Sequence, residues 1–531
     1  MKQLGGLDAS FLYMETPQTP MHVAGLSIIE LPPGFKGSFY DTYKAHIAGR
    51  LHLFPVLLKK IVQVPWDIDH PLWVDDDEID LDYHIRHLGL PKPGTMKQLE
   101  ELVGRLHSNF LDRSRPLWEF YVIDGLADKR LAIYTKIHHA AVDGGAGMVL
   151  TNMMYDATPV PRRIEPPAPK QAAAKAAPDA LGLLGAAYKN MLSQHVSALQ
   201  KIPDVLKAIA SVAAPVISGA ARLEVKGLPN LVAPKTMLNT SITSQRSFAA
   251  RSLPLADAKA IGKLTETKLN DVVMAICAGA LRRYLLEKHG LPKEPLIAMV
   301  PVSLREAGNT EIRNQVSGML CSLATDVADP LERLKAIHAS SVEAKEFSGK
   351  IKDVTPRDFS IFGAPIVLQG AMGLYGRSGL ADRLPPSANV VISNVPGPQT
   401  PLYLAGARLT TLYPVSIPTH GVALNLTVQS YCGALDFGLT ACRRTVPELP
   451  KLAGYLEESL LELHEAVMGA APAAVAAAAP KAGQRAGPKA RRPGPSAKAK
   501  ARAPAGKARP AAKPVPAKSR QVVKSAKAAR G

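Results

Sequence analysis

The sequence predicts an α/β protein with two lobes of similar organisation, joined by a long linker and followed by a basic tail. The 531 residues are too many for one ordinary core, because domains average roughly 100–200 residues. Segments with strand and helix patterns alternate along the chain, and each half ends in a long hairpin followed by a helix. The expected boundaries are an N-terminal lobe at 1–157, a linker at 158–235, a C-terminal lobe at 236–470 and a tail at 471–531.

The first lobe shows the period-2 and period-3.6 hydrophobic patterns of strands and helices. Its expected elements are a strand at 21–31, a helix at 39–62 that breaks near Pro55, two strands at 116–140 joined by a turn from Asp124 to Lys129, and a helix at 146–157.

The second lobe continues with the same kinds of pattern. Its expected elements are a long helix at 269–290, strands at 295–305 and 388–397, a hairpin at 421–444 that turns at Cys432 and Gly433, and a helix at 448–468. The linker is rich in Pro and Ala, and its stretch Asp204–Leu223 has the mixed character of an interfacial helix.

The net charge of +19 belongs to the tail. Residues 481–531 hold 16 Lys and Arg and no acidic residue, so the remainder carries 48 positive and 45 negative charges. The tail is low-complexity Ala, Pro and Lys and is expected to be disordered. Such a tail can bind nucleic acid by counterion release, but the nearly neutral lobes offer no basic surface for reading it.

The four cysteines, Cys277, Cys321, Cys432 and Cys442, are too scattered for a disulfide framework and favour a reducing compartment. We expect no signal peptide and no membrane span, because no apolar run reaches about 18 residues. The acidic run at 75–82 lacks the glycine and terminal glutamate of a calcium loop, so it is interpreted as a solvated loop.

The stretch Ile137–Met148, "IHHAAVDGGAGM", carries the most distinctive chemistry. It follows a predicted strand, on which successive side chains point to opposite faces. His138 and His139 therefore cannot both reach one small site, which argues against a shared metal ion. Asp143 lies beyond a loop of small residues that can curl back beneath the strand end, and Gly144 allows unusual backbone conformations.

The pattern fits a single catalytic imidazole held by its surroundings. A histidine with an ordinary pKa can remove a proton from a hydroxyl or amine at neutral pH. The alternative is that the two histidines have no special role, which is the commoner situation for an isolated pair.

With these residues in view, the sequence resembles a known family. "HHAAVDG" matches HHxxxDG, the active-site motif of the CoA-dependent acyltransferase superfamily, which includes condensation domains and chloramphenicol acetyltransferase. More specifically, the chain resembles the bacterial wax ester synthase/diacylglycerol acyltransferase family. The matching segments are "LDASFLYMETPQTPMHVAG", "SRPLWEFYVIDGL", "LNDVVMAICAGALRRYL", "VPVSLR" and "VISNVPGP".

The resemblance implies two chloramphenicol-acetyltransferase-like lobes with the active site in a channel between them. It implies that His139 is the general base, His138 supports it, Asp143 is structural and Gly144 leaves room for substrate. Long-chain acyl-CoA would be the co-substrate, with no further cofactor and no metal. The acceptor would be diacylglycerol or a fatty alcohol, giving triacylglycerol or wax ester.

Further candidate substrate-binding residues lie outside the HHxxxDG motif. Asn270 and Asp271 match the family's second motif, and Asn270 is either a helix N-cap or a polar contact at the active site. The other candidates are Pro116, Leu117 and Trp118, which more readily shape the core or a tunnel, and Asn394 and Gly397 in a rigid loop near the acyl-CoA channel.

Two other functions are kept open. One is a condensation-type acyltransferase that acts on another alcohol or amine. The other is a protein without enzymatic activity that binds nucleic acid or the cell envelope through its tail. For the enzyme we expect a cytoplasmic location, with peripheral contact to the inner membrane or to lipid inclusions.

Overall fold

The computed structural model describes residues 2–166 apart from 68 and 143, 232–303, 316–351 and 378–469, together with Gly370 and residues 374 and 375. Residues 1–478 form one compact unit. The basic tail and most of the linker, including the stretch Asp204–Leu223, lie outside the described residues. Within the described part of the chain, no helix is long and apolar enough to cross a membrane.

The first sheet contains the hairpin that ends in the two histidines. In the described residues it has six strands in the order β12, β13, β2, β7, β6 and β5. Their bounds are β2 (His22–Glu30), β5 (Ile85–Gly89), β6 (Trp118–Asp124), β7 (Leu131–His138), β12 (Tyr403–Leu404) and β13 (Ala407–Val415). β5 and β6 are parallel, whereas the other neighbours are antiparallel. The strand expected at 21–31 and the hairpin expected at 116–140 are confirmed.

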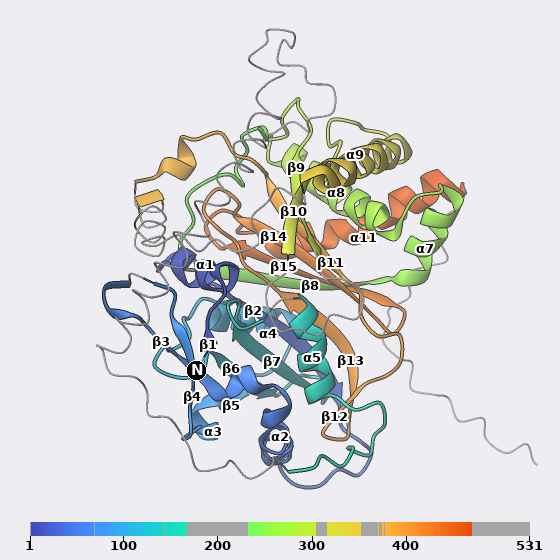
Figure 1. Cartoon of the computed structure of the whole chain (residues 1–531). Coiled ribbons are helices and arrows are strands. Elements are labelled where there is room, and N and C mark those ends of the chain that lie inside the picture. The colour runs from blue at the N-terminus through green and yellow to red at the C-terminus, as the bar shows by residue number, and fades with distance from the viewer. Residues whose placement is uncertain are drawn as a thin grey trace, which may run out of the picture. The chain divides into compact units, whose positions relative to one another are not determined.

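Helices and a small sheet surround this sheet (Figure 1). The helices are α1 (Gly6–Met14), α2 (Phe39–Ala48), α3 (Leu81–His84), α4 (Met96–His107) and α5 (Gly144–Met154). The small sheet consists of β1 (Lys2–Gln3), β3 (Lys59–Val62) and β4 (Leu72–Asp75).

The prediction of a helix at 39–62 is wrong beyond Ala48. There the chain turns at Gly49 and forms two 3₁₀ turns, Leu51–Leu53 and Pro55–Leu58, before β3. Its apolar residues Leu51, Phe54 and Leu57 are buried. Their spacing of three suits a 3₁₀ turn, which has three residues per turn. A spacing of three also occurs in α-helical patterns, which is why the sequence predicts an α-helix here.

The second sheet has, among the described residues, six strands in the order β10, β9, β11, β14, β15 and β8. Their bounds are β8 (Arg246–Pro254), β9 (Ile297–Ser303), β10 (Val316–Ser322), β11 (Val390–Val395), β14 (Leu424–Tyr431) and β15 (Ala434–Cys442). The hairpin of β14 and β15 turns at Cys432 and Gly433 as expected. Both residues have positive φ, 43° and 84°, as a two-residue hairpin turn requires.

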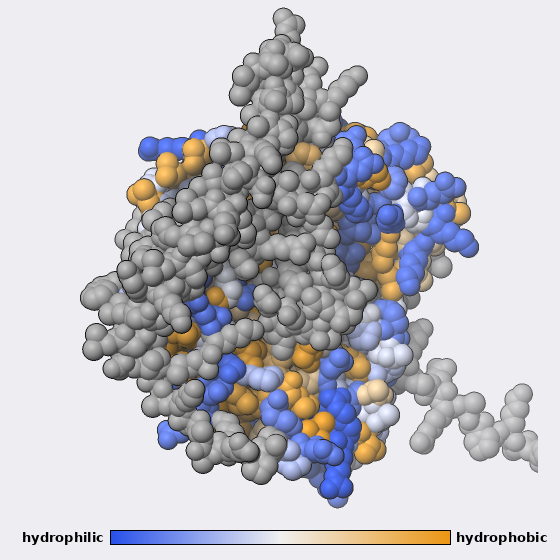
Figure 2. All heavy atoms as spheres, viewed as in Figure 1, coloured by the Kyte–Doolittle hydropathy of each residue, from blue (hydrophilic) through white to orange (hydrophobic). Residues whose placement is uncertain are grey.

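The helices of the second half are α7 (Leu255–Leu264), α8 (Leu269–Glu287), α9 (Pro330–Ile351) and α11 (Leu449–Met468). α8 and α11 confirm the expected helices. In α11 the buried residues recur at helical spacing, as in Leu449, Leu452, Leu456, Leu460 and Leu463. The outward faces of α7, α9 and α11 are mainly hydrophilic in Figure 2.

The boundary between the lobes differs from the expectation in one respect. Residues 403–415 were assigned to the second lobe, yet β12 and β13 complete the sheet of the first (Figure 1, orange β13). β13 pairs with β2 from Arg408 opposite Glu30 to Val415 opposite Ala24. The strand pattern is present in the sequence, but a period of two does not say which sheet a strand joins.

α4 also joins the two halves by covering the edge strand β8. The Glu100 carboxylate accepts the N–H of Ala250 at 2.9 Å, and the Ser108 hydroxyl accepts that of Arg246 at 2.9 Å. A Cβ on Gly104 would lie 2.8 Å from the Arg246 carbonyl oxygen. Only glycine allows the helix to approach this closely, and two N–H groups of the edge strand are thereby satisfied.

Candidate active site

The end of β7 is held by the strands on both sides of it. The N–H of His138 donates to Leu117 O at 3.0 Å, and that of His139 donates to Met21 O at 2.8 Å. Immediately afterwards the chain turns, with the N–H of Ala141 bonded to His138 O at 2.9 Å. The backbone of the histidine pair is therefore fixed where this central strand ends.

The ring of His139 lies flat against Phe11 of α1. Their centroids are 4.0 Å apart and the ring planes differ by 14°. His139 is half-buried. A stacked ring is fixed in its plane, so its nitrogen atoms are presented in a defined direction.

The ring of His138 has different neighbours and is buried, with 1% of its surface exposed. The N–H of Ala140 donates to its Nδ1 at 3.1 Å. This places the ring proton on Nε2, because a neutral imidazole carries one proton. Nε2 lies 3.4 Å from Oε1 of Glu15, which is long for a hydrogen bond, so the contact is mainly electrostatic.

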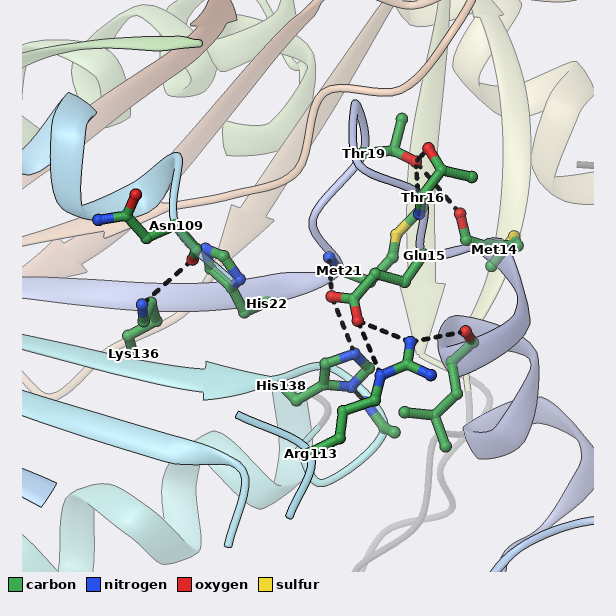
Figure 3. A network of polar contacts seen from close by, with 12 residues as sticks. Met14, Glu15, Thr16, Thr19, Met21, His22, Asn109, Arg113, Lys136 and His138 are labelled. Atoms are coloured by element: carbon green, nitrogen blue, oxygen red, sulfur yellow. Dashed lines mark hydrogen bonds and ion pairs between the residues drawn. The ribbon is translucent and has the colours of Figure 1, made fainter. Parts of the chain in front are cut away.

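Glu15 follows α1 directly and is at the centre of this polar group (Figure 3). Its Oε1 accepts the N–H of Met21 at 3.0 Å, and its Oε2 accepts from Arg113 Nε at 3.1 Å and Nη2 at 2.6 Å. Burial opposes ionisation of this carboxyl, but His138, Arg113 and the Met21 N–H together lower its pKa to about 2. Glu15 is therefore a buried anion at neutral pH.

More polar groups are buried beside His138. Lys136 is fully buried, its Nζ lies 2.8 Å from Oε2 of Glu119, and it donates to Asn109 O at 3.2 Å (Figure 3). His22 lies opposite His138 on β2 and bonds through Nε2 to His107 O at 2.9 Å. Burial lowers the pKa of His22, so it is neutral.

A hollow of about 320 Å³ opens next to Glu15. It is lined by Glu15, Thr16, Pro17, Phe110, Leu111 and Arg113. Phe110 is 42% exposed there. Free space thus lies beside the Glu15–Arg113 pair.

Of the other motif residues, Asp143 lies outside the described residues, and Gly144 is the first residue of α5.

The candidates on α8 have separate partners. The N-cap is Lys268, so Asn270 is the second residue of the helix and does not cap it. Asn270 accepts from the side chain of Asn394 at 3.5 Å, which brings two candidates together. Asp271 is fully buried and accepts from the N–H of Lys268 at 3.1 Å and from Nδ1 of His338 at 2.7 Å.

Gly397 lies against β14. Its N–H donates to the Ser430 hydroxyl at 3.1 Å, and a Cβ would lie 2.1 Å from the Ser430 carbonyl oxygen. A side chain does not fit at this position without movement of the backbone.

Pro116, Leu117 and Trp118 are buried. The indole N–H of Trp118 donates to Leu57 O at 2.9 Å, and the ring stacks on His84 with centroids 4.3 Å apart. These contacts are those of core residues.

Comparison with known proteins identifies the family of this chain. A family model described as the wax ester synthase/diacylglycerol acyltransferase catalytic domain matches residues 4–273, and the C-terminal domain of the same family matches 313–464. This chain belongs to the wax ester synthase/diacylglycerol acyltransferase family.

Individual members of the family align along most of the chain. A probable diacylglycerol O-acyltransferase of Mycobacterium tuberculosis is 39% identical over 87% of this chain and 98% of its own length. The O-acyltransferase WSD of Acinetobacter baylyi is 36% identical over 88% and 98%. The structure of the wax ester synthase/diacylglycerol acyltransferase from Marinobacter aquaeolei is similar with a TM-score of 0.62 and 32% identity, over 88% of this chain and all of that one.

Sequence reasoning did not single out Phe11, Glu15 or Arg113. The first two lie in a segment that carries the family resemblance, but nothing in their spacing shows that they meet the histidines. A contact between a turn at residue 15 and a strand end at residue 138 is set by the tertiary fold. A single carboxylate after a helix that already contains Asp8 gives no local signal of this contact.

Proposed function

We propose that this chain transfers a long-chain acyl group from acyl-CoA to the hydroxyl of diacylglycerol or of a fatty alcohol. The observation that carries the proposal is the position of His139. It directly follows β7 in the matched catalytic domain, its backbone is bonded to Met21, and its ring plane is fixed by Phe11.

In this proposal His139 acts as the general base. Its unprotonated ring nitrogen takes the proton of the acceptor hydroxyl while the oxygen attacks the thioester carbonyl carbon. The tetrahedral intermediate collapses as the C–S bond breaks, and the CoA thiolate takes the proton back from the imidazolium. The products are an ester and free CoA, and the enzyme returns to its starting state.

This chemistry requires no nucleophile from the protein, because the acceptor itself attacks. It also requires no cofactor beyond the acyl-CoA co-substrate. His138 supports the turn, Asp143 is structural and Gly144 leaves room for substrate. The polar candidates in the second half of the chain are Asn270, Asp271 and Asn394, of which Asn270 and Asn394 contact each other.

The acceptors and products of this reaction partition into bilayers and lipid droplets. We therefore propose that the protein works at the surface of the inner membrane or of lipid inclusions. The support is the chemistry of the substrates together with the basic tail, whose 16 positive charges attract anionic lipid.

The test is a product analysis with purified protein. Labelled palmitoyl-CoA is supplied with diacylglycerol or with hexadecanol, and the lipids are separated. Formation of labelled triacylglycerol or wax ester supports the proposal, and the ratio of the two gives the preferred acceptor. If neither ester forms but another alcohol or an amine is acylated, the chain is a condensation-type acyltransferase with a different acceptor.

A further inference from the structure

The two histidines of the motif are both contacted from one short segment of chain. α1 carries Phe11, which stacks on His139. Glu15, the residue after α1, lies 3.4 Å from Nε2 of His138. The orientation of both rings therefore depends on how this segment is held against the end of β7.

Glu15 also reaches His139 through the backbone. Its Oε1 accepts the N–H of Met21 at 3.0 Å (Figure 3). The carbonyl of Met21 in turn accepts the N–H of His139 at 2.8 Å. The Glu15 carboxylate thus holds the N–H of Met21, and the carbonyl of Met21 holds the backbone of His139, the proposed base.

The ring of His138 provides a second connection. It is held between Glu15 at Nε2 and the N–H of Ala140 at Nδ1, 3.1 Å away. Ala140 is the residue after His139. Rotation of the His138 ring would break the bond to Ala140 and loosen the turn that presents His139.

The carboxylate itself is held firmly. Arg113 donates to Oε2 from both Nε and Nη2, and the same Nη2 also donates to Leu12 O at 3.0 Å. The side chain of Glu15 is only 5% exposed. A buried carboxylate held by a guanidinium through two hydrogen bonds has a strongly preferred geometry.

We propose that Glu15 is a positioning residue for acyl transfer. Through His138 and the backbone of Met21 it fixes the position of His139. This inference rests on the proposed role of His139 as general base. Glu15 does not touch the reacting atoms, so its loss displaces the base without removing it. A displacement of about 1 Å at a reacting group can lower the rate about 100-fold.

The test compares Glu15→Gln with Asp156→Asn in the full-length protein. Asp156 is a matched control because its buried carboxylate also pairs with an arginine, Arg50, at 2.7 Å with both side chains 3% exposed. Its other bonds run to Arg162 and to the backbone of Tyr403. We expect Glu15→Gln to lower kcat by about 10- to 100-fold, with KM for both substrates within about threefold. Asp156→Asn should lower the Tm but keep kcat within about threefold.

A double-mutant cycle separates positioning from general stability. In a His139→Ala background, Glu15→Gln should cause no further loss of residual activity, because the group that it positions is absent. A further fall in that background, parallel to a fall in Tm, would make Glu15 a purely structural residue and overturn the inference.

Glu15→Asp is the second variant if Glu15→Gln does not fold. It keeps the charge beside Arg113 but is too short to reach His138 and Met21 together, so kcat should still fall. Wild-type kcat in the folded variant overturns the inference. Full activity of His139→Ala itself would instead overturn the proposed mechanism.

Discussion

The ring of Phe11 lies parallel to that of His139, with centroids 4.0 Å apart and the planes inclined by 14°. The stack joins α1 to the turn that follows β7. It fixes the plane of the imidazole that we propose as the general base. The same segment of chain then continues to Glu15, which contacts the other histidine.

Removing the stack should lower activity more than stability. For Phe11→Ala we expect kcat to fall about tenfold, because the imidazole loses its support, while the lost aromatic pair costs about 0.5–1.5 kcal/mol beyond its buried area. The matched control is Phe35→Ala, a half-buried ring that packs edge-on against Phe39 at 6.0 Å. If both variants are less stable but keep the wild-type kcat, the stack contributes to packing and not to catalysis.

Asp436 should make stability depend on pH. Burial raises its pKa to about 6 from 3.8, although the N–H of Leu412 and the hydroxyl of Ser252 both donate to it. Because the folded pKa is the higher one, the stability that it contributes is present below about pH 4 and is lost as the pH rises through about 6. Asp436→Asn removes this loss, since the amide stays neutral.

The expected gain for Asp436→Asn is up to about 3 kcal/mol at pH 8, with little difference from the parent at pH 4. Urea unfolding at a series of pH values measures it. A variant that is less stable than the parent by the same amount at every pH would show that Asp436 is ionised in the folded protein and needed as an anion.

Two glycine substitutions should act in opposite directions. Gly397→Ala places a Cβ 2.1 Å from the Ser430 carbonyl oxygen, so we expect it to destabilise the protein by about 1–3 kcal/mol. Gly454, within α11, has no atom within 4 Å of an added Cβ, and Gly454→Ala should stabilise by about 1 kcal/mol. A Gly397→Ala variant that melts like the parent yet loses activity would instead place substrate at this loop.

The tail provides a prediction about membrane binding. Deletion of residues 481–531 removes 16 positive charges, each worth up to about 1 kcal/mol near an anionic surface. Binding to anionic vesicles should therefore fall at low salt, while activity on detergent-dispersed substrate persists. Equal vesicle binding by the deletion variant and the full-length protein at every salt concentration would show that the tail is not the anchor.

Much of the fold could be predicted because the decisive patterns are local. β2, the hairpin of β6 and β7, α8, the hairpin of β14 and β15, and α11 each follow from hydrophobic period and turn residues. The position of β13 in the first sheet could not be predicted, because its partner β2 is chosen by tertiary packing. The prediction of a helix after Ala48 was wrong because apolar residues spaced by three suit both an α-helix and successive 3₁₀ turns.

The site was predictable to a similar degree. His138 and His139 stand out because an unusual residue pair follows a strand, and the resemblance assigns them roles. Glu15 and Arg113 could not be placed, since a single carboxylate and a single guanidinium carry no pattern. Asn270 was one candidate for the N-cap of α8, but the N-cap is Lys268, two residues earlier.

The most direct test of the account is the single-turnover rate of acyl transfer by His139→Ala, measured with labelled palmitoyl-CoA and saturating acceptor. The control is His87→Gln, because His87 is exposed on β5 and bonded to Asp124 at 2.9 Å. We expect the rate to fall about 10²–10⁴-fold for His139→Ala, with the fold intact and only the small loss of stability that follows from removing the Phe11 stack. The rate should stay at the wild-type value for the control. A wild-type rate in folded His139→Ala would contradict the assignment of His139 as the general base.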